Sequence, residues 1–311
     1  MIRSDFTLKN DDGIEVYVYK WSPDAGVLPR GVVQIAHGMA EHAGRYGRFA
    51  DFLANNGYIV YANDHRGHGR TAGDPEAAGY LGRDGFFGMA RDMKLLTDRI
   101  KAEEPDLPLY LFGHSMGSFL AQYYITKWGG GLKGVILSGS NLQKGPVLKA
   151  GIIIAGLQRL LLGDRKRSKL LNSLSFDSFN KRFRPVRTPF DWLSRDTAEV
   201  DRYVADPYCG AVFTTSFFHD FFKGLDGLYD KAALEAIPKD LPVLILSGDM
   251  DPVGGFGKGP RLLEKLYHSL GLLDVTLKLY TDGRHEMLNE INRDEVMKDI
   301  LGWLGKYERL L

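Results

Sequence analysis

The chain has one cysteine, Cys209, among 311 residues, and its 40 basic residues are balanced by 39 acidic ones. A lone cysteine cannot form a disulfide within the chain, so a fold held together by disulfides is excluded and a reducing, cytoplasmic setting is expected. The net charge of +1 gives no overall field that would attract nucleic acid. We therefore expect a cytoplasmic protein without a nucleic-acid partner.

Long apolar runs are lacking as well. No stretch approaches the ~18 consecutive apolar residues that suggest a membrane span. The closest one, residues 150–162, is interrupted by Gln158 and Arg159. The first residues include charged side chains and no apolar signal core. A chain of this length with 44% hydrophobic residues can instead bury one large core, with room for an insertion.

Continuous apolar runs alternate with segments of helical spacing over most of the chain. Before them, alternating apolar and polar residues on both sides of residues 11–13 predict a hairpin of two half-buried strands. This order predicts an α/β fold with a mostly parallel sheet, an antiparallel N-terminal edge and helices on both faces. The runs interpreted as buried strands are residues 31–36, 58–62, 109–112, 132–138, 241–247 and 275–280.

About a hundred residues without this alternation separate the strands at 132–138 and 241–247. We interpret residues 1–140 and 235–311 as two parts of the core, and residues 141–234 as a helical insertion. Between residues 159 and 187 the insertion carries nine Lys or Arg but only two Asp. This excess indicates either a solvated helix face or a surface that makes transient contact with anionic lipid.

Residues 109–121 read as a strand, a Gly-X-Ser-X-Gly turn and a helix. Ser115 on such a turn is lifted off the sheet edge by a strained backbone, and Gly113 and Gly117 let the turn close. The same pattern also occurs in ordinary glycine-rich turns. A serine hydroxyl is a weak nucleophile at neutral pH, so a catalytic Ser115 also needs a base, an acid that orients the base, and donors for an oxyanion.

Loops that follow other strands offer these parts. Ligands bind beyond the carboxyl ends of strands in open α/β sheets, so the residues there are the candidates. Asp249 and Asp251 follow one strand and His285 follows the next. The order serine, aspartate, histidine is the one expected for a nucleophile on this kind of turn. His285 is expected to take the Ser115 proton while one of the two aspartates orients the imidazole.

Two main-chain amides are expected to hold the oxyanion. Met116 follows the nucleophile at the start of a helix, where an amide points outward. The second amide is expected from the loop after residues 31–36, where Gly38 lets the chain turn so that the Met39 amide points at the same place.

Four segments together resemble the α/β-hydrolase superfamily, and within it the monoacylglycerol lipase and lysophospholipase-like branch. Residues 37–46 resemble its oxyanion segment His-Gly-X-Gly-Glu-His-X-X-Arg-Tyr, with Ala40 in place of a glycine. Residues 64–69 resemble its Asp-X-X-Gly-X-Gly loop, and residues 113–117 match its nucleophile turn. Residues 248–253 resemble its Gly-X-X-Asp-X-Val turn, which assigns the acid to Asp251. The insertion lies where that family carries a cap over the active site.

The resemblance implies a serine ester hydrolase that works through an acyl-enzyme, with Ser115, Asp251 and His285 as its catalytic residues. Met39 and Met116 would supply the oxyanion amides, and no metal or cofactor is expected. Monoacylglycerols or lysophospholipids are the expected substrates, with Ile153 and Leu157 of the insertion expected to bind the acyl chain. The alternatives are a peptidase or another hydrolase with the same three residues, or a non-catalytic binding protein of this fold. The oligomeric state is not indicated.

Histidines at 37, 42, 65 and 68 invite a metal-site interpretation. No set of cysteines or carboxylates in the sequence completes such a site. We therefore interpret these histidines as structural residues or as part of the oxyanion loop.

Overall fold

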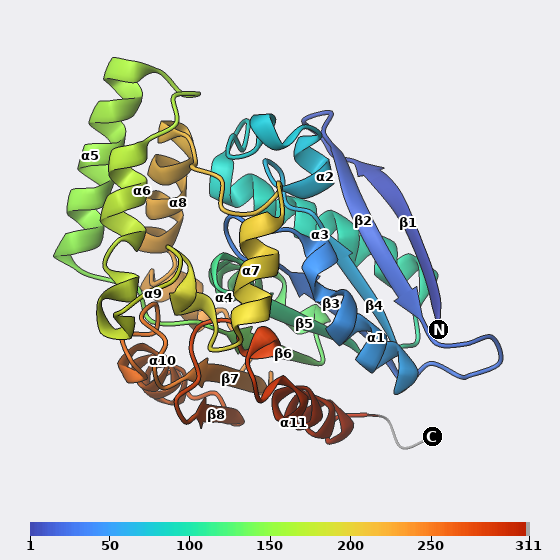
Figure 1. The fold of residues 1–311 in the computed structure, drawn as a ribbon. Helices are drawn as coiled ribbons and strands as arrows, with labels where there is room; N and C mark the ends of the chain where they lie inside the picture. The colour runs from blue at the N-terminus through green and yellow to red at the C-terminus, as the bar shows by residue number, and fades with distance from the viewer. Residues whose placement is uncertain (309–311) are drawn as a thin grey trace.

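The computed structural model describes residues 1–308, in which eight strands form one sheet of order β1-β2-β4-β3-β5-β6-β7-β8 (Figure 1). β1 pairs with β2, and β2 with β4, in antiparallel fashion, whereas all other pairs are parallel. The strands are β1 (Ile2–Lys9), β2 (Glu15–Ser22), β3 (Gly31–Ala36), β4 (Tyr58–Asn63), β5 (Leu109–His114), β6 (Gly134–Ser138), β7 (Val243–Gly248) and β8 (Val275–Tyr280).

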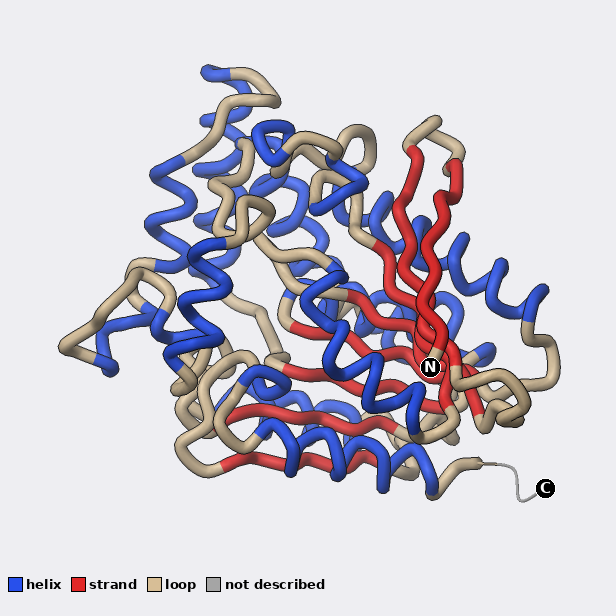
Figure 2. The backbone as a smooth tube through the Cα atoms, turned by 45° about the vertical axis from the view of Figure 1, so that its right-hand side comes forward, coloured by secondary structure: helices blue, strands red, loops and turns tan. Residues whose placement is uncertain are grey.

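The sheet lies between two layers of helices, as Figure 2 shows. β3 to β7 are buried at every position because both faces are covered, which explains their continuous apolar sequences. On β7, Val243 and Ile245 pack on one layer and Leu244 and Leu246 on the other, as strand geometry requires. One layer contains α1 (Gly47–Asn55) and α11 (Arg293–Gly305), and the other contains α3 (Gly85–Glu103), α4 (Met116–Trp128) and α10 (Lys258–Ser269).

The segment between β6 and β7 is helical and lies beyond the carboxyl ends of the central strands (Figure 1). Here α5 (Pro146–Leu162) packs along α8 (Thr215–Gly227), and α8 also packs on α3 of the core. We call this segment the cap. Its remaining helices are α6 (Lys169–Phe176), η4 (Phe179–Phe183), η5 (Asp191–Leu193), α7 (Thr197–Ala205) and α9 (Lys231–Glu235).

The predicted α/β-hydrolase architecture is confirmed, with the antiparallel hairpin at the N-terminal edge. The strands at residues 31–36 and 275–280 have the predicted bounds, whereas β6 and β7 each begin two residues later than predicted. The segment at residues 64–69, which resembles the Asp-X-X-Gly-X-Gly loop, leads into the single helical turn α2 (Gly69–Ala72). Short 3-10 turns complete the described elements: η1 (Ala43–Tyr46), η2 (Pro75–Ala77), η3 (Gly129–Gly131) and η6 (Met287–Asn289).

Over residues 1–308, no helix has both the length and the apolar character that crossing a bilayer demands.

Candidate active site

Ser115 lies on the sharp turn between β5 and α4, with a φ of 50° and a ψ of −117°. Residues other than glycine rarely adopt a positive φ, so this backbone is strained. The turn has no room for a side chain at positions 113 and 117. A Cβ atom on Gly113 would collide with the Gly117 carbonyl, and one on Gly117 would collide with the Ala36 carbonyl of β3. The glycines at both positions thus allow β5 to pass directly into α4, with Ser115 at the helix N-terminus.

His285 and Asp251 come from the loops after β8 and β7 and lie in contact. Nδ1 of His285 is 3.0 Å from Oδ2 of Asp251, and both side chains are buried. The imidazole ring is held between His114 and Trp192, with ring centroids 4.7 and 5.1 Å away. Burial by itself lowers the pKa of His285, but the Asp251 carboxylate outweighs this effect and leaves the pKa raised. The pair therefore stabilises a proton on the imidazole.

Of the two aspartates after β7, only Asp251 hydrogen-bonds His285. Asp249 closes the turn instead, since its Oδ1 accepts the Asp282 amide at 2.8 Å and its own amide donates to the Tyr280 carbonyl at 3.0 Å. The two carboxylates are two residues apart in sequence and have separate partners.

The loop after β3 lies against the nucleophile turn. A Cβ atom on Gly38 would be 3.3 Å from Cβ of Ser115, so Met39 is held next to the serine. Met39 and Met116 both line the cavity above Ser115, and within residues 1–308 neither amide donates a hydrogen bond to another residue. Two amides without a protein acceptor, beside a nucleophile, suit a developing oxyanion.

His37, His65 and His68 form a buried cluster behind this loop. Nε2 of His37 accepts the His65 amide at 2.9 Å, and Nδ1 of His37 is 2.7 Å from the Gly38 carbonyl. Burial, with the neighbouring histidine, lowers the pKa of both His65 and His68 to about 3. The cluster is therefore neutral at physiological pH and supports the Gly38 backbone.

A buried ion-pair network, which the sequence did not predict, joins this loop to the histidine loop. Arg45 donates to both carboxylate oxygens of Glu286, at 2.7 Å each, and also to Glu41. Oε1 of Glu41 in turn accepts the Gly38 amide at 2.6 Å. Burial raises the pKa of Glu41, but Arg45, together with His114 and the hydrogen bonds from Tyr46 and the Gly38 amide, leaves the pKa lowered. Arg45 and Glu286 are 241 positions apart, so no sequence spacing could pair them.

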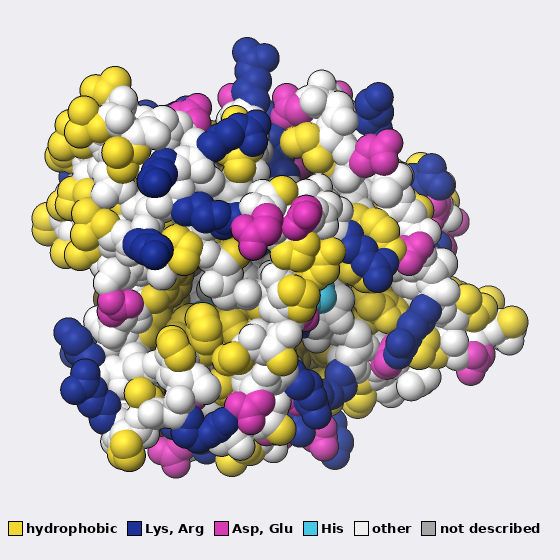
Figure 3. Space-filling model, turned by 45° about the horizontal axis from the view of Figure 1, so that its top comes forward, with side chains coloured by type: hydrophobic (Ala, Val, Ile, Leu, Met, Phe, Trp, Pro, Cys, Tyr) yellow, Lys and Arg dark blue, Asp and Glu magenta, His cyan; other side chains and the backbone are white. Residues whose placement is uncertain are grey.

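A cavity of about 770 Å³ lies over Ser115 between the core and the cap, and His285 also lines it. Figure 3 shows the molecule hollowed here, with hydrophobic side chains in the hollow. Its apolar wall suits an acyl chain. α5 contributes Val147, Leu148, Ala150, Gly151 and Ile154, and the aromatic wall consists of Phe119, Phe176, Phe179, Phe190, Trp192, Tyr203, Phe218, Phe221 and Phe222.

The structure does not bring Ile153 and Leu157 to this cavity, contrary to the expected acyl-chain contact. Their side chains lie on the outer side of α5 and are 64% and 55% exposed. α5 is apolar around most of its circumference, so its periodicity could not distinguish the inner face from the outer one. A usable signal was present in α8, where Phe218, Phe221 and Phe222 share one helix face.

Replacing Ile154 by Ala should lower kcat/KM for a long-chain ester by about tenfold, because each buried methylene contributes ~0.8 kcal/mol. An acetyl ester, which does not reach α5, should be hydrolysed at nearly the wild-type rate. Ile153→Ala is the matched control on the exposed side of the same helix and should change neither rate. A parallel loss of both rates with a lower Tm would instead assign Ile154 to cap packing.

One group of potential metal ligands exists in the described chain: His42, Asp206 and Cys209, whose ligand atoms lie within 4.8 Å of one another. Nε2 of His42 is 3.0 Å from a carboxylate oxygen of Asp206, and burial raises the pKa of the Cys209 thiol. None of these residues lines the cavity over Ser115. They join the core to the cap and lie apart from the candidate catalytic residues.

An open α/β sheet with a serine on the turn after β5, and an Asp–His pair on the loops after β7 and β8, defines an α/β-hydrolase. The family model described as serine aminopeptidase, S33 (Hydrolase_4) matches residues 28–292, and the chain belongs to this family.

Curated relatives place the chain in the monoglyceride lipase-like branch of that superfamily. A monoacylglycerol lipase of Mycolicibacterium smegmatis is 31% identical over 309 residues, which cover 97% of each chain. The human monoglyceride lipase is 29% identical over 311 residues, covering 96% of this chain and 89% of the human one. Among solved structures, a thermostable carboxyl esterase from Bacillus coagulans in complex with glycerol aligns over 99% of each chain at 29% identity, with a TM-score of 0.91.

Proposed function

We propose that this protein is a carboxylic ester hydrolase that cleaves monoacylglycerols through an acyl-enzyme on Ser115. The observation that carries the proposal is the hydrogen-bonded His285–Asp251 pair, whose His285 lines the same largely apolar cavity as Ser115. The relatives named as monoacylglycerol lipases, matched over nearly the whole chain, support the substrate class.

In this mechanism Oγ of Ser115 attacks the ester carbonyl carbon while Nε2 of His285 takes the hydroxyl proton. Asp251 holds the proton on Nδ1, which keeps Nε2 free to accept, and stabilises the imidazolium that forms. The carbonyl oxygen becomes an oxyanion held by the amides of Met39 and Met116. Collapse of this intermediate breaks the ester C–O bond, and His285 gives its proton to the departing glycerol oxygen. Water then repeats the sequence on the acyl-enzyme and releases the fatty acid and Ser115.

The aromatic wall and the inner side of α5 would hold the acyl chain. The leaving alcohol would lie in the part of the cavity next to Ser115. The fatty acyl class follows from this apolar lining. Lysophospholipids share the acyl part of the substrate and differ in the head group.

The test combines a serine-directed fluorophosphonate probe with rate measurements on three substrate series. Labelling of Ser115, with higher kcat/KM on monoacylglycerols than on lysophosphatidylcholines or aminoacyl amides, supports the proposal. A folded protein in which Ser115 is not labelled would be a binding protein. A preference for the amides would indicate a peptidase. A preference for the lysophosphatidylcholines would indicate that the substrate carries a lysophospholipid head group rather than glycerol alone.

We also propose that the cap makes transient contact with anionic lipid surfaces, where a monoacylglycerol substrate resides. Large apolar side chains are exposed along α5 and α6 (Figure 3), and residues 166–184, which include α6 and follow α5 in the cap, carry exposed Lys and Arg side chains. Apolar groups beside cations are the combination that favours binding to an anionic interface. The exposed apolar residues are Val147, Ile153, Leu157, Leu160, Leu161, Leu162, Leu170 and Leu174.

Leu160→Ser combined with Leu161→Ser should weaken binding to vesicles of anionic phospholipid by at least about tenfold, since fully burying a leucine contributes ~1.5–3 kcal/mol. Hydrolysis of a water-soluble short-chain ester should not change. Leu28 and Leu273 of the core are equally exposed, at 79% and 80% against 81% and 78%, so their double replacement by Ser is the matched control. Equal vesicle affinity of both double variants in co-sedimentation would contradict the lipid contact.

A further inference from the structure

Ala40, at the position where the related motif has a glycine, adopts a left-handed backbone conformation with a φ of 58°. This conformation is energetically unfavourable for residues with a Cβ atom, whereas glycine adopts it readily. Ala40 directly follows Met39, whose amide is the proposed oxyanion donor. The loop therefore needs contacts that hold Ala40 in a disfavoured conformation.

Those contacts come from the cap. The Ala40 carbonyl accepts the Tyr203 hydroxyl at 2.8 Å and the Gly210 amide at 2.9 Å. On the other side of Met39, the Gly38 amide is fixed by the buried Glu41 carboxylate at 2.6 Å. Met39 thus lies between two peptide groups, each held by its own partner.

Tyr203 is itself held in place. Its side chain is 5% exposed, its ring packs on Phe190 with centroids 4.9 Å apart, and the Arg45 guanidinium lies 4.8 Å from the ring centre. Arg45 is the same residue that pairs with Glu286 next to His285. The tyrosine hydroxyl therefore reaches the loop from a buried side chain that packs on Phe190 and Arg45.

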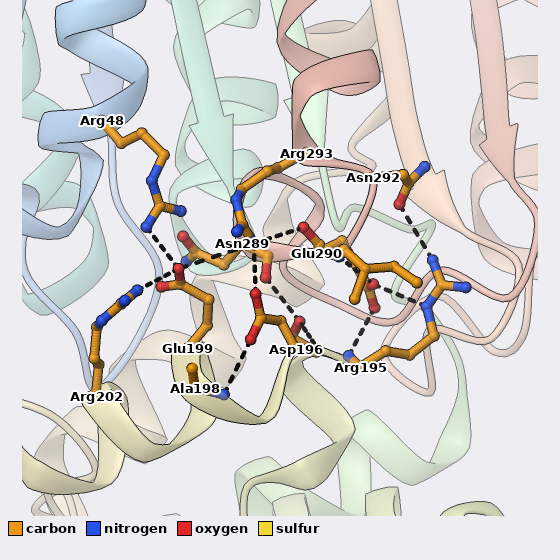
Figure 4. Close-up of polar contacts among 12 residues, drawn as sticks. Arg48, Arg195, Asp196, Ala198, Glu199, Arg202, Asn289, Glu290, Asn292 and Arg293 are labelled. Atoms are coloured by element: carbon orange, nitrogen blue, oxygen red, sulfur yellow. Dashed lines mark hydrogen bonds and ion pairs between the residues drawn. The ribbon is translucent and has the colours of Figure 1, made fainter.

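α7, which carries Tyr203, is anchored to the core by charged contacts at its N-terminal half (Figure 4). These contacts reach α1, the loop before α11 and the first residue of α11, so the start of α7 is held by two parts of the core. The anchoring pairs are Arg48–Glu199 at 2.6 Å, Arg293–Asp196 at 2.7 Å and Arg195–Glu290 at 2.8 Å.

We propose that Tyr203 of the cap is a positioning residue for the oxyanion loop: its hydroxyl, with the Gly210 amide, holds the Ala40 carbonyl and so keeps the Met39 amide directed at the oxyanion. The inference rests on the proposed esterase function. It assigns to the anchored part of the cap a role in catalysis besides covering the substrate. Because the Cβ atom of Ala40 makes this backbone conformation unfavourable, the loop depends on this contact more than a loop with glycine at position 40 would.

The test is Tyr203→Phe, which removes one oxygen and keeps the packed ring. The oxyanion forms only in the transition state, so kcat should fall by about tenfold while KM changes by less than about twofold. The Tm should stay close to that of the control. Tyr208→Phe is this control, because its hydroxyl also donates to a main-chain carbonyl, that of Gly73 at 3.1 Å, but away from the loop.

Ala40→Gly supplies the second measurement. Glycine adopts the left-handed conformation without the contact, so the loss of kcat on Tyr203→Phe should shrink to about twofold in the Ala40→Gly background. Equal kcat for Tyr203→Phe and Tyr208→Phe would overturn the inference. A fall of kcat that accompanies a fall of Tm and is not relieved by Ala40→Gly would also overturn it, since that pattern marks a purely structural tyrosine. Failure of the proposed function looks different, because the wild-type protein itself would then not hydrolyse esters.

Discussion

Ser115→Ala and His285→Ala should each abolish nearly all turnover of a monoacylglycerol, leaving only the ~10³–10⁴-fold acceleration over water that binding and the oxyanion amides sustain. The nucleophile and its base act as a unit, so removing either one should cost about as much as removing both. The double variant is therefore expected to be no slower than the single ones, and progress curves of fatty acid release measure all three.

The fold should tolerate both changes. Ser115 has strained backbone angles, and alanine removes only the hydroxyl oxygen. Ser175→Ala is a suitable control, because it removes another hydroxyl from the cavity wall and should retain most activity. Circular dichroism melts should give similar Tm values for all variants. Substantial esterase activity in a folded Ser115→Ala protein would contradict the mechanism.

Sequence reasoning succeeded where one local pattern determines one local structure. β3 and β8 were predicted with their bounds because apolar runs between turn residues have few other structures open to them. The Gly-X-Ser-X-Gly turn was predictable because only glycine fits at positions 113 and 117. The convergence of the loops after β7 and β8 follows from the parallel arrangement of strands, so His285 and one of the two aspartates could be brought together before any coordinates, and the family resemblance selected Asp251.

Sequence reasoning failed where neighbouring residues are equally apolar but face different sides of a helix, and where two contacting residues are far apart in the chain. Ile153 and Ile154 are adjacent and chemically identical, and only the packing of α5 on α8 decides which one faces the cavity. Tyr203 is 163 positions from Ala40, and nothing in either neighbourhood indicates that a hydroxyl meets that carbonyl. The strand pattern thus predicted the candidate catalytic residues, whereas the contact between Tyr203 and Ala40 required the structure.

Asp251→Asn should lower kcat by about four orders of magnitude, because an amide in place of the acid favours the imidazole tautomer that cannot accept the serine proton. Asp249→Asn should cost far less, since Asp249 accepts only the Asp282 amide and an amide oxygen can still accept it. The two substitutions make the same chemical change two residues apart on one loop. Similar losses of kcat, or a larger loss for Asp249→Asn, would contradict the assignment of Asp251 as the residue that orients His285.

The pH dependence gives an independent reading of the same pair. His285 must be neutral to accept the serine proton, so kcat/KM of the wild type should fall as the pH falls through the pKa of His285. Burial alone lowers that pKa, and the Asp251 carboxylate raises it above the ordinary value of 6.5. With asparagine at 251 the main raising effect is lost, and burial is opposed only by the lesser effects of Glu286 and Glu41, so the acid limb of the residual activity should move to lower pH. Asp249→Asn should leave the limb in place, because that carboxylate does not contact the imidazole.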